Sequence, residues 1–260
     1  DIAALSSMFL TFQCFNIYRE QSRQTGKTTW AAGELDINWN IRCRNADIAI
    51  VNFDDSAAKE NLQKVIEYSE YLPEYLKVFK LNVKEHSDNS IDIEDSGEIG
   101  KTVKVATNKV FGNRLIAKTV GTTPAMANKV GKGGTFSIEF FDEVAVYPNL
   151  ELVLGAAAPA FKTASDNAKK GGFPTYIYLT STPPDMGSPQ GEYLYKLVKV
   201  NALKFEPYMF DLSTAQLKAL QKSVAKNSYF YVSYSYKELG FSDEWALEHF
   251  ENSGSQWLFE

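Results

Sequence analysis

The sequence predicts an α/β fold in which a mostly parallel central sheet is flanked by helices. Three apolar segments of strand length, at residues 14–18, 136–141 and 176–179, each run into a polar segment. The first is followed by a segment of helical pattern at residues 28–35, so that strand, loop and helix succeed one another. The chain has 260 residues and is 44% hydrophobic, which is ordinary for one α/β body with insertions.

The polar segment after the first strand ends in Gly26, Lys27 and Thr28. These residues match the end of the phosphate-binding pattern G-x-x-x-x-G-K-[ST], whose backbone N–H groups, lysine and hydroxyl meet the phosphates and Mg²⁺. Gln21 stands where the pattern has its first glycine. The order of strand, loop and helix still places a helix N-terminus against an anion. Taken alone, the tripeptide is equally compatible with a turn that only caps a helix.

The second strand ends in two adjacent carboxylates, Asp142 and Glu143. This is the Walker B position of P-loop ATPases, where the first acid coordinates Mg²⁺ and the second polarises the water that attacks the γ-phosphate. We therefore assign Asp142 to the metal and Glu143 to the base. The alternative is a strand that simply ends in a polar turn, and two motifs in this order make that interpretation the weaker one.

The third strand ends in the hydroxyls of Thr180, Ser181 and Thr182 and is stopped by two prolines. Ligands of an open α/β sheet lie at the carboxyl ends of its parallel strands, so the three strand ends are expected to converge on one crevice. The hydroxyls are then placed to sense the γ-phosphate. Alone, this segment is as compatible with an ordinary turn, because Ser, Thr and Pro are common turn residues.

Together the three segments resemble the ATPase domain of the large terminase subunit of tailed bacteriophages, the motor that packages DNA into the procapsid. The family's Walker A motif reads Ser-Arg-Gln-x-Gly-Lys-Thr-Thr, and residues 22–29 agree with it at every defined position. Residues 46–52, a helix from Ser56 and residues 71–76 look like the family's second strand, helix and Leu-Pro-x-x-Leu segment. The resemblance covers nearly the whole chain and implies an ASCE-type P-loop NTPase fold.

The resemblance also implies a role for each residue of the site. Glu143, Lys27 and Arg23 would be catalytic, with the guanidinium of Arg23 acting on the γ-phosphate within its own subunit. An Arg23 that pairs with one of the two acids in the empty site is the alternative. Thr28 and Asp142 would hold Mg²⁺, and Thr180, Ser181 and Thr182 would couple hydrolysis to movement. The residues implied to bind ATP are Ser22, Arg23, Gln24, Thr25, Gly26, Lys27, Thr28 and Thr29.

The implied activity is ATP hydrolysis that moves double-stranded DNA, in a ring of subunits on the capsid portal protein and with the small terminase subunit. The isolated domain is expected to be a monomer, and the expected location is the cytoplasm of the host cell. One rival is a helicase-like or other P-loop DNA translocase, although such enzymes generally lack the Ser-Arg-Gln form of Walker A. A second rival is a catalytically silent nucleotide-binding module.

The sequence departs from the family before Walker B. Some terminases are proposed to receive an arginine from the neighbouring subunit, carried by the loop that here spans residues 122–134. This segment has Lys129 and Lys132 but no arginine. These lysines, and Arg114 further upstream, are weaker substitutes, so Arg23 is the best-placed arginine.

We expect an ATPase domain at residues 1–228 and a lid-like or linker subdomain at residues 229–260, leading toward a nuclease domain that is not in the chain. Since the chain opens at Asp1 without Met, we expect an excised domain that lacks the family's adenine-recognition segment. The aromatic strand at residues 229–236 either stacks nucleic acid or packs on the sheet, and packing is preferred. Further helices are predicted at residues 56–72, 150–164, 191–200 and 214–226, with mobile loops at 130–134 and 167–172.

Composition limits the other classes of function. The net charge is −5, whereas a protein that grips the DNA backbone should show a basic face. Neither a membrane span nor a secretory leader is predicted. Cys14 and Cys43 lie in unrelated segments and are expected to be reduced, buried thiols. His86 and His249 have no metal-ligand spacing.

Overall fold

The computed structural model describes residues 16–21, 25–73, 91–94, 105–108, 110–132, 134–227 and 229–253. Within these residues, nine strands form one sheet in the order β3-β4-β5-β2-β6-β7-β1-β9-β8. Neighbours from β5 to β8 in this order are parallel, and the pairs β3–β4 and β4–β5 are antiparallel. The strands are β1 (Asn16–Gln21), β2 (Asp47–Asn52), β3 (Ile91–Glu94), β4 (Val105–Asn108), β5 (Asn113–Thr119), β6 (Ile138–Phe141), β7 (Tyr176–Ser181), β8 (Ala202–Lys204) and β9 (Tyr229–Tyr234).

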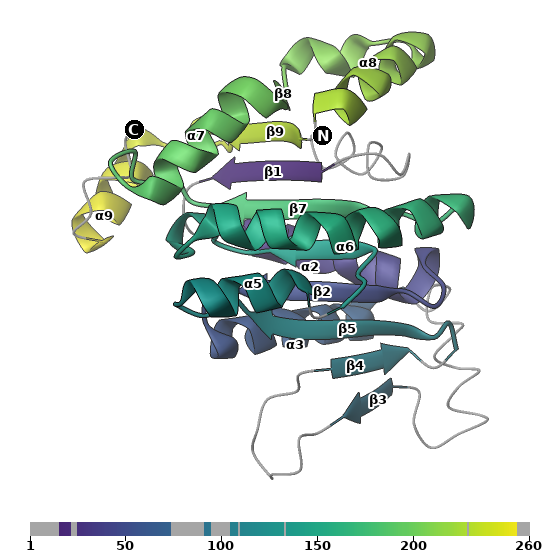
Figure 1. Cartoon of the computed structure of the whole chain (residues 1–260). Helices are drawn as coiled ribbons and strands as arrows, with labels where there is room; N and C mark the ends of the chain where they lie inside the picture. The colour runs from purple at the N-terminus through teal and green to yellow at the C-terminus, as the bar shows by residue number, and fades with distance from the viewer. Residues whose placement is uncertain are drawn as a thin grey trace.

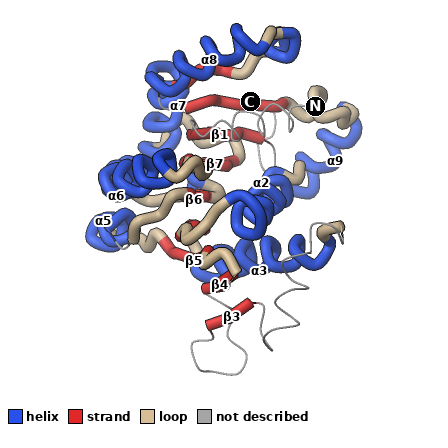
Figure 2. Tube along the Cα trace, turned by 90° about the vertical axis from the view of Figure 1, so that its right-hand side faces the viewer, coloured by secondary structure: helices blue, strands red, loops and turns tan. Residues whose placement is uncertain are grey.

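Helices cover both faces of the sheet, as Figure 1 and the view in Figure 2 show. One face carries α2 (Lys27–Ile37) and α3 (Asp55–Tyr71), and the other carries α5 (Pro124–Lys132), α6 (Leu150–Lys170) and α7 (Pro189–Asn201). The predicted fold class, a mostly parallel sheet flanked by helices, is therefore confirmed. The remaining helical segments are η1 (Asn38–Arg42), η3 (Val144–Val146), η4 (Pro207–Asp211), α8 (Thr214–Asn227) and α9 (Asp243–Ser253).

The alternation of side chains along the central strands divides the core between the two faces. Ile138 and Phe140 of β6 belong to the cluster under α2 and α3, whereas Phe141 belongs to the cluster under α5, α6 and α7. Every residue of β6 and β7 is buried. Strands buried on both faces are read from the sequence as continuous apolar runs, which explains why these two were predictable.

β7 lies between β1 and β6 in the sheet. The strand that enters the P-loop and the strand that ends in Asp142 and Glu143 are therefore not direct neighbours. Their carboxyl ends nevertheless lie at the same edge because all three strands are parallel. This arrangement places the end of β7 between the two motifs.

The segment at residues 122–134, expected to be a loop, contains helix α5. Its N-terminus is capped by Thr123, whose Oγ1 accepts a hydrogen bond of 3.3 Å from the N–H of Met126, and Pro124 occupies the first helical position. The helix packs against α6. The expected loop at residues 130–134 is therefore helical up to Lys132.

Helix α6 ends later than predicted. It was expected to stop at Ala164, but it continues to Lys170 and takes up most of the expected loop at residues 167–172. The end is set by Gly172, whose φ of +75° lies in the left-handed region that favours glycine. The N–H of Gly172 donates to the carbonyl of Lys169 over 3.1 Å, which closes the last turn.

Strand β9 follows the boundary that was expected after residue 228. It pairs in parallel with β1 on one side and with β8 on the other, so the sheet extends to Tyr234. Phe230, Val232 and Tyr234 are buried in a third apolar cluster with residues of α8. Of the two interpretations of the aromatic strand, packing on the sheet is thus confirmed.

Among the described residues, no helix is both long and apolar enough to span a membrane.

Candidate active site

The first part of the site is the start of α2. Gly26 precedes the helix with φ +79°, a conformation that a residue with a side chain adopts only with strain. The helix then begins at Lys27, so its free N–H groups point to the carboxyl edge of the sheet, where they can bind an anion. Lys27 is buried, Thr28 is half-buried, and Thr29 is exposed. Ser22, Arg23 and Gln24 lie outside the described residues, and the roles predicted for them stay predictions.

The second part of the site surrounds Asp142, which directly follows β6 and is 4% exposed. The hydroxyl of Thr180 donates to Oδ1 over 2.5 Å, and the side-chain amide of Asn61 donates to Oδ2 over 2.8 Å. The Oγ1 atom of Thr28 lies 3.4 Å from Oδ1 and 3.3 Å from Oδ2. The carboxylate is thus held by donors from α2, α3 and β7.

Glu143 joins the two parts. Its Oε1 atom lies 2.7 Å from Nζ of Lys27, and its Oε2 atom accepts hydrogen bonds from the N–H (3.1 Å) and the hydroxyl (3.3 Å) of Thr182. Its backbone has φ +55°, a left-handed conformation that is uncommon for a residue other than glycine. Such strained positions collect at functional sites and cost about 1–3 kcal/mol.

The end of β7 contacts three residues of the segment from Asp142 to Ala145. Thr180 reaches Asp142 and Thr182 reaches Glu143, while Ser181 accepts a hydrogen bond of 3.1 Å from the N–H of Ala145. The structure therefore brings Lys27, Thr28, both acids and the three hydroxyl residues together at one edge of the sheet. The chemical roles assigned to them from the sequence remain predictions.

Other predicted residues lie apart from this edge. Lys129 is exposed on α5, where Lys132 is the last residue of the helix. Arg114 lies near the amino end of β5, at the opposite edge of the sheet, in a bidentate contact with Asp47 (2.7 and 2.5 Å). Cys43 is buried without a disulfide, and burial raises the pKa of its thiol to about 12. Cys14 and His86 lie outside the described residues.

Asn61 was missed from the sequence. It lies on α3 among the buried residues Ala58, Leu62 and Val65, and it is itself 5% exposed. A polar side chain on an apolar helix stripe needs a hydrogen-bond partner. That signal was available, although only the fold shows that the partner is Asp142.

Glu20 was also not singled out. Its carboxylate accepts hydrogen bonds from the hydroxyls of Tyr18 (2.7 Å) and Tyr231 (3.2 Å). Burial raises the pKa of Glu20, and the two hydroxyls counter that effect in part. Gln21, in the position of the missing first glycine, is 1% exposed, and neither polar atom of its side chain has a partner among the described residues.

The sheet order and the assembled edge are those of the P-loop NTPase fold, in its ASCE-type form with one strand between the two motifs. Among solved structures, the chain is similar to the large terminase of a thermophilic bacteriophage. In the complex of that terminase with ADP, the TM-score is 0.52 at 13% identity, over 92% of this chain and 45% of that one. In its complex with ATP-γ-S, the TM-score is 0.50 at 13% identity, over 95% of this chain and 46% of that one.

At 13% identity the likeness shows the fold. The chain spans a little under half the length of that terminase. No protein-family model matches the sequence, and no curated protein matches it. The predicted ASCE-type P-loop NTPase fold is thereby confirmed.

Proposed function

We propose that this chain is an Mg²⁺-dependent ATPase whose hydrolysis of ATP drives double-stranded DNA into a viral procapsid, as the ATPase part of a large terminase subunit. The observation that carries the ATPase activity is the contact of 2.7 Å between Lys27 and Glu143. This contact supports the proposal because it joins a lysine at the start of α2 to an acid that follows a separate strand, and both could then act on one phosphate group. The similar terminase of the thermophilic bacteriophage has been captured with ADP and with ATP-γ-S, which supports nucleotide binding to this fold.

Phosphate binding would fall to the start of α2. The N–H groups of its first turn are directed at the anion, and Lys27 adds a positive charge beside them. Because Lys27 is 5% exposed, its ammonium group interacts with a phosphate with little screening by water. The same ammonium group contacts Glu143 in the structure, so a bound nucleotide would have to break this ion pair.

The residues present fit a magnesium ion. Thr28 and Asp142 supply a hydroxyl and a carboxylate, the oxygen ligands that this cation prefers. Among the described residues, no group of three or more His, Cys, Asp or Glu could enclose a metal. A site with one carboxylate suits Mg²⁺, which keeps several waters and binds phosphate oxygens. When bound, the ion would neutralise charge that develops on the phosphate oxygens.

Glu143 would act as the base. Its side chain is 32% exposed, so water can reach it, and its hydrogen bonds with Thr182 keep one oxygen fixed when Lys27 moves to the phosphate. The freed oxygen then accepts a proton from the attacking water. Asn61 and Thr180 meanwhile hold the Asp142 carboxylate in one orientation.

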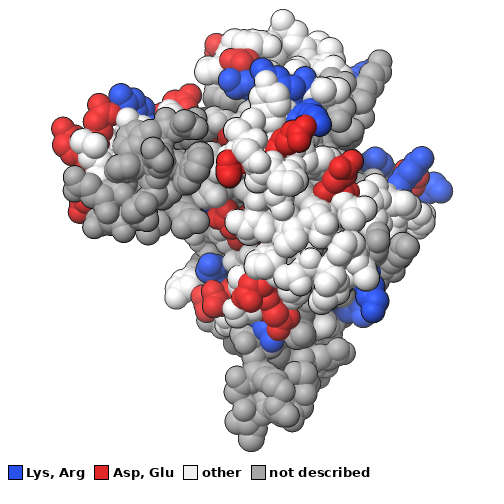
Figure 3. Space-filling model, turned by 60° about the vertical axis from the view of Figure 1, so that its left-hand side comes forward, with Lys and Arg blue, Asp and Glu red and all other residues white. Residues whose placement is uncertain are grey.

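Two observations support the proposed packaging activity: the Ser-Arg-Gln sequence at residues 22–24 and the fold. On the face shown in Figure 3, acidic and basic side chains are interspersed. This mixed distribution of charge agrees with the net charge of −5. We propose that the protein holds DNA through an assembly of several subunits rather than through a basic face of one subunit. We propose a homo-oligomeric ring on the portal protein, with the small terminase subunit as a further partner and the host cytoplasm as the location.

Phosphate release by the purified chain with Mg·ATP tests the ATPase activity. We expect hydrolysis that both Glu143→Gln and Lys27→Ala abolish. Equal rates in the wild type and both variants would refute the assignment, and binding without hydrolysis in the wild type would identify a silent nucleotide-binding module. Stimulation by portal-bound procapsids, rather than by free DNA alone, separates a packaging motor from a helicase-like translocase.

A further inference from the structure

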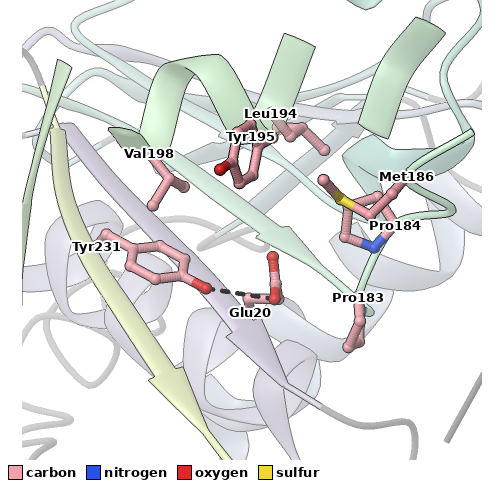
Figure 4. A pocket seen from close by; sticks show the side chains of 8 residues that line it. All are labelled: Glu20, Pro183, Pro184, Met186, Leu194, Tyr195, Val198 and Tyr231. Carbon is pink, nitrogen blue, oxygen red and sulfur yellow. Dashed lines mark hydrogen bonds between the residues drawn. The ribbon is translucent and has the colours of Figure 1, made fainter. Parts of the chain in front are cut away.

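A cavity of about 150 Å³ lies beside the candidate active site (Figure 4). Its floor is Glu20 of β1 and Tyr231 of β9, and its roof is α7. The residues after β7 close one side. Pockets for drug-sized molecules begin at about 300 Å³, so this cavity has room for one side chain. The lining residues are Glu20, Pro183, Pro184, Met186, Leu194, Tyr195, Val198 and Tyr231.

The cavity combines one carboxylate, that of Glu20, with mostly apolar lining residues. The carboxylate of Glu20 accepts one hydrogen bond on each oxygen, from the hydroxyls of Tyr18 and Tyr231. Each carboxylate oxygen can accept a second hydrogen bond. Among the groups that influence the pKa of Glu20 there is no cation within the described residues. A positive group in the cavity would therefore meet a carboxylate whose charge is not yet balanced there.

The rim is apolar and exposed. Met186 is 52% exposed and Tyr195 is 49% exposed, and both line the cavity. Tyrosine and methionine are enriched where proteins contact one another. Glu20 itself is half-buried, and a partly shielded charge inside a ring of apolar contacts resembles the surroundings of an interface anchor residue.

We propose that this cavity receives an arginine side chain of a partner protein, with Glu20 as its counter-ion and Tyr195 and Met186 as the contact rim. A planar guanidinium offers two parallel N–H donors to the two carboxylate oxygens, and its face stacks on tyrosine rings. The net charge of −5 favours a partner with a basic surface. The site is separate from the nucleotide site, since none of its lining residues holds Asp142 or Glu143.

Four of the five arginines of this chain argue against a second copy as the occupant. Arg19 is packed against the rings of Trp30 and Tyr234. Arg42 pairs with Glu34, Arg44 donates to two backbone carbonyls, and Arg114 pairs with Asp47. Each of these four described arginines would have to give up its contacts to enter the cavity of a neighbour.

Methyl NMR of protein labelled at methionine tests the proposal. The chain has four methionines, Met8, Met126, Met186 and Met209, so the signals are assignable by substitution. The probe is N-acetyl-arginine methylamide, and its uncharged counterpart is N-acetyl-citrulline methylamide. We expect the arginine probe to shift the Met186 signal to saturation, and the citrulline probe to bind at least about tenfold more weakly because the charge-assisted hydrogen bonds are lost.

Two pairs of variants sharpen the test. Glu20→Gln should abolish the preference for arginine over citrulline, whereas Glu192→Gln, an exposed acid on α7, should keep it. Tyr195→Ala should weaken arginine binding several-fold without unfolding the protein, since the ring is half exposed, and Tyr208→Ala, at a 58% exposed tyrosine elsewhere, should not.

Three results would contradict binding of an arginine side chain at Glu20. Equal shifts by both probes, an arginine preference that survives Glu20→Gln, or no saturation of Met186 up to the solubility limit would overturn the proposal. Sedimentation velocity decides the occupant. A wild-type protein that stays monomeric supports a different partner protein, and self-association that Glu20→Gln removes would overturn that choice in favour of a second copy.

Discussion

Lys27 and Glu143 form an ion pair of 2.7 Å that links the P-loop to the strand carrying both acids. In this arrangement the lysine expected on the phosphates is neutralised by the expected base. Under the proposed function, a nucleotide would therefore compete with Glu143 for Lys27. Binding of ATP would then have two effects at once, since it would gain a cation for the phosphates and release the carboxylate for water.

This competition gives the first prediction. In Glu143→Gln the partner of Lys27 loses its charge, so nucleotide binding should become tighter while hydrolysis falls by roughly 10²–10⁴-fold, the usual contribution of a positioned base. Fluorescence titration with an ATP analogue and phosphate release measure the two effects separately. Glu192→Gln, which breaks an exposed pair with Lys196, is the matched control and should change neither. Weaker nucleotide binding in Glu143→Gln would contradict the competition.

The second prediction concerns Asn61, a positioning residue that acts through Asp142. Removing its hydrogen bond of 2.8 Å in Asn61→Ala should raise the Mg²⁺ concentration for half-maximal ATPase by roughly tenfold, because groups that orient metal ligands contribute 10–100-fold to metal affinity. The maximal rate at saturating Mg²⁺ should recover largely. Gln63→Ala on the same helix, whose amide donates to Glu67, should leave the Mg²⁺ dependence as it is. A lower maximal rate with an unchanged Mg²⁺ dependence would show a different role.

The third prediction is a pH dependence of stability. Glu139 of β6 is 3% exposed, and burial raises its pKa to about 8, against a smaller lowering by Lys118. The folded state then binds a proton that the unfolded state releases above its ordinary pKa of 4.5. The free energy of unfolding should therefore fall as the pH rises through the window between these two values, and the loss is complete above about 8.

Glu139→Gln removes this loss. From pH 6 to pH 9 its stability advantage over the wild type should grow by about 3 kcal/mol, since about two pH units lie between pH 6 and the raised pKa and each corresponds to about 1.4 kcal/mol. Urea unfolding at several pH values measures it. Glu192→Gln should show a constant difference over the same range, because its pKa is lowered by Lys196 and lies below this window. A constant difference for Glu139→Gln as well would disprove an elevated pKa.

The fourth prediction comes from the sequence and concerns Arg23. If its guanidinium acts in its own subunit, Arg23→Ala should lower the turnover rate by about 10³-fold, the lower end for such arginines. Mixing Arg23→Ala subunits with Glu143→Gln subunits should then restore no activity. Recovered phosphate release in the mixture would mean that an arginine acts across the subunit interface.

The sequence predicted the parts of the site that lie in continuous motifs. Strand ends in a parallel sheet meet at one edge, so Lys27, Asp142 and Thr180 could be placed together from their positions after apolar runs. Asn61 and Glu20 could not be placed in this way, because their partners Asp142 and Tyr231 come from distant segments. Only the fold decides which helix face or neighbouring strand reaches them.

The errors in the elements have a similar origin. Gly- and Lys-rich residues at 130–134 suggested a loop, yet Thr123 and Pro124 provide a helix start, and packing against α6 overrides a weak local propensity. The aromatic strand at 229–234 was assigned to a separate subdomain because it follows a long polar helix. Its place beside β1 is a long-range pairing that no local pattern specifies.

The end of β7 also limits how this protein can vary. Thr180, Ser181 and Thr182 are consecutive, and each meets a different part of the segment from Asp142 to Ala145. Substitutions earlier in the strand change packing and, at Tyr176, a hydrogen bond from Asn38, but leave these three hydroxyls in place. One inserted or deleted residue between Tyr176 and Thr180 would instead move every hydroxyl to the wrong acceptor. Its length, more than its composition, should therefore be the property that natural variants preserve.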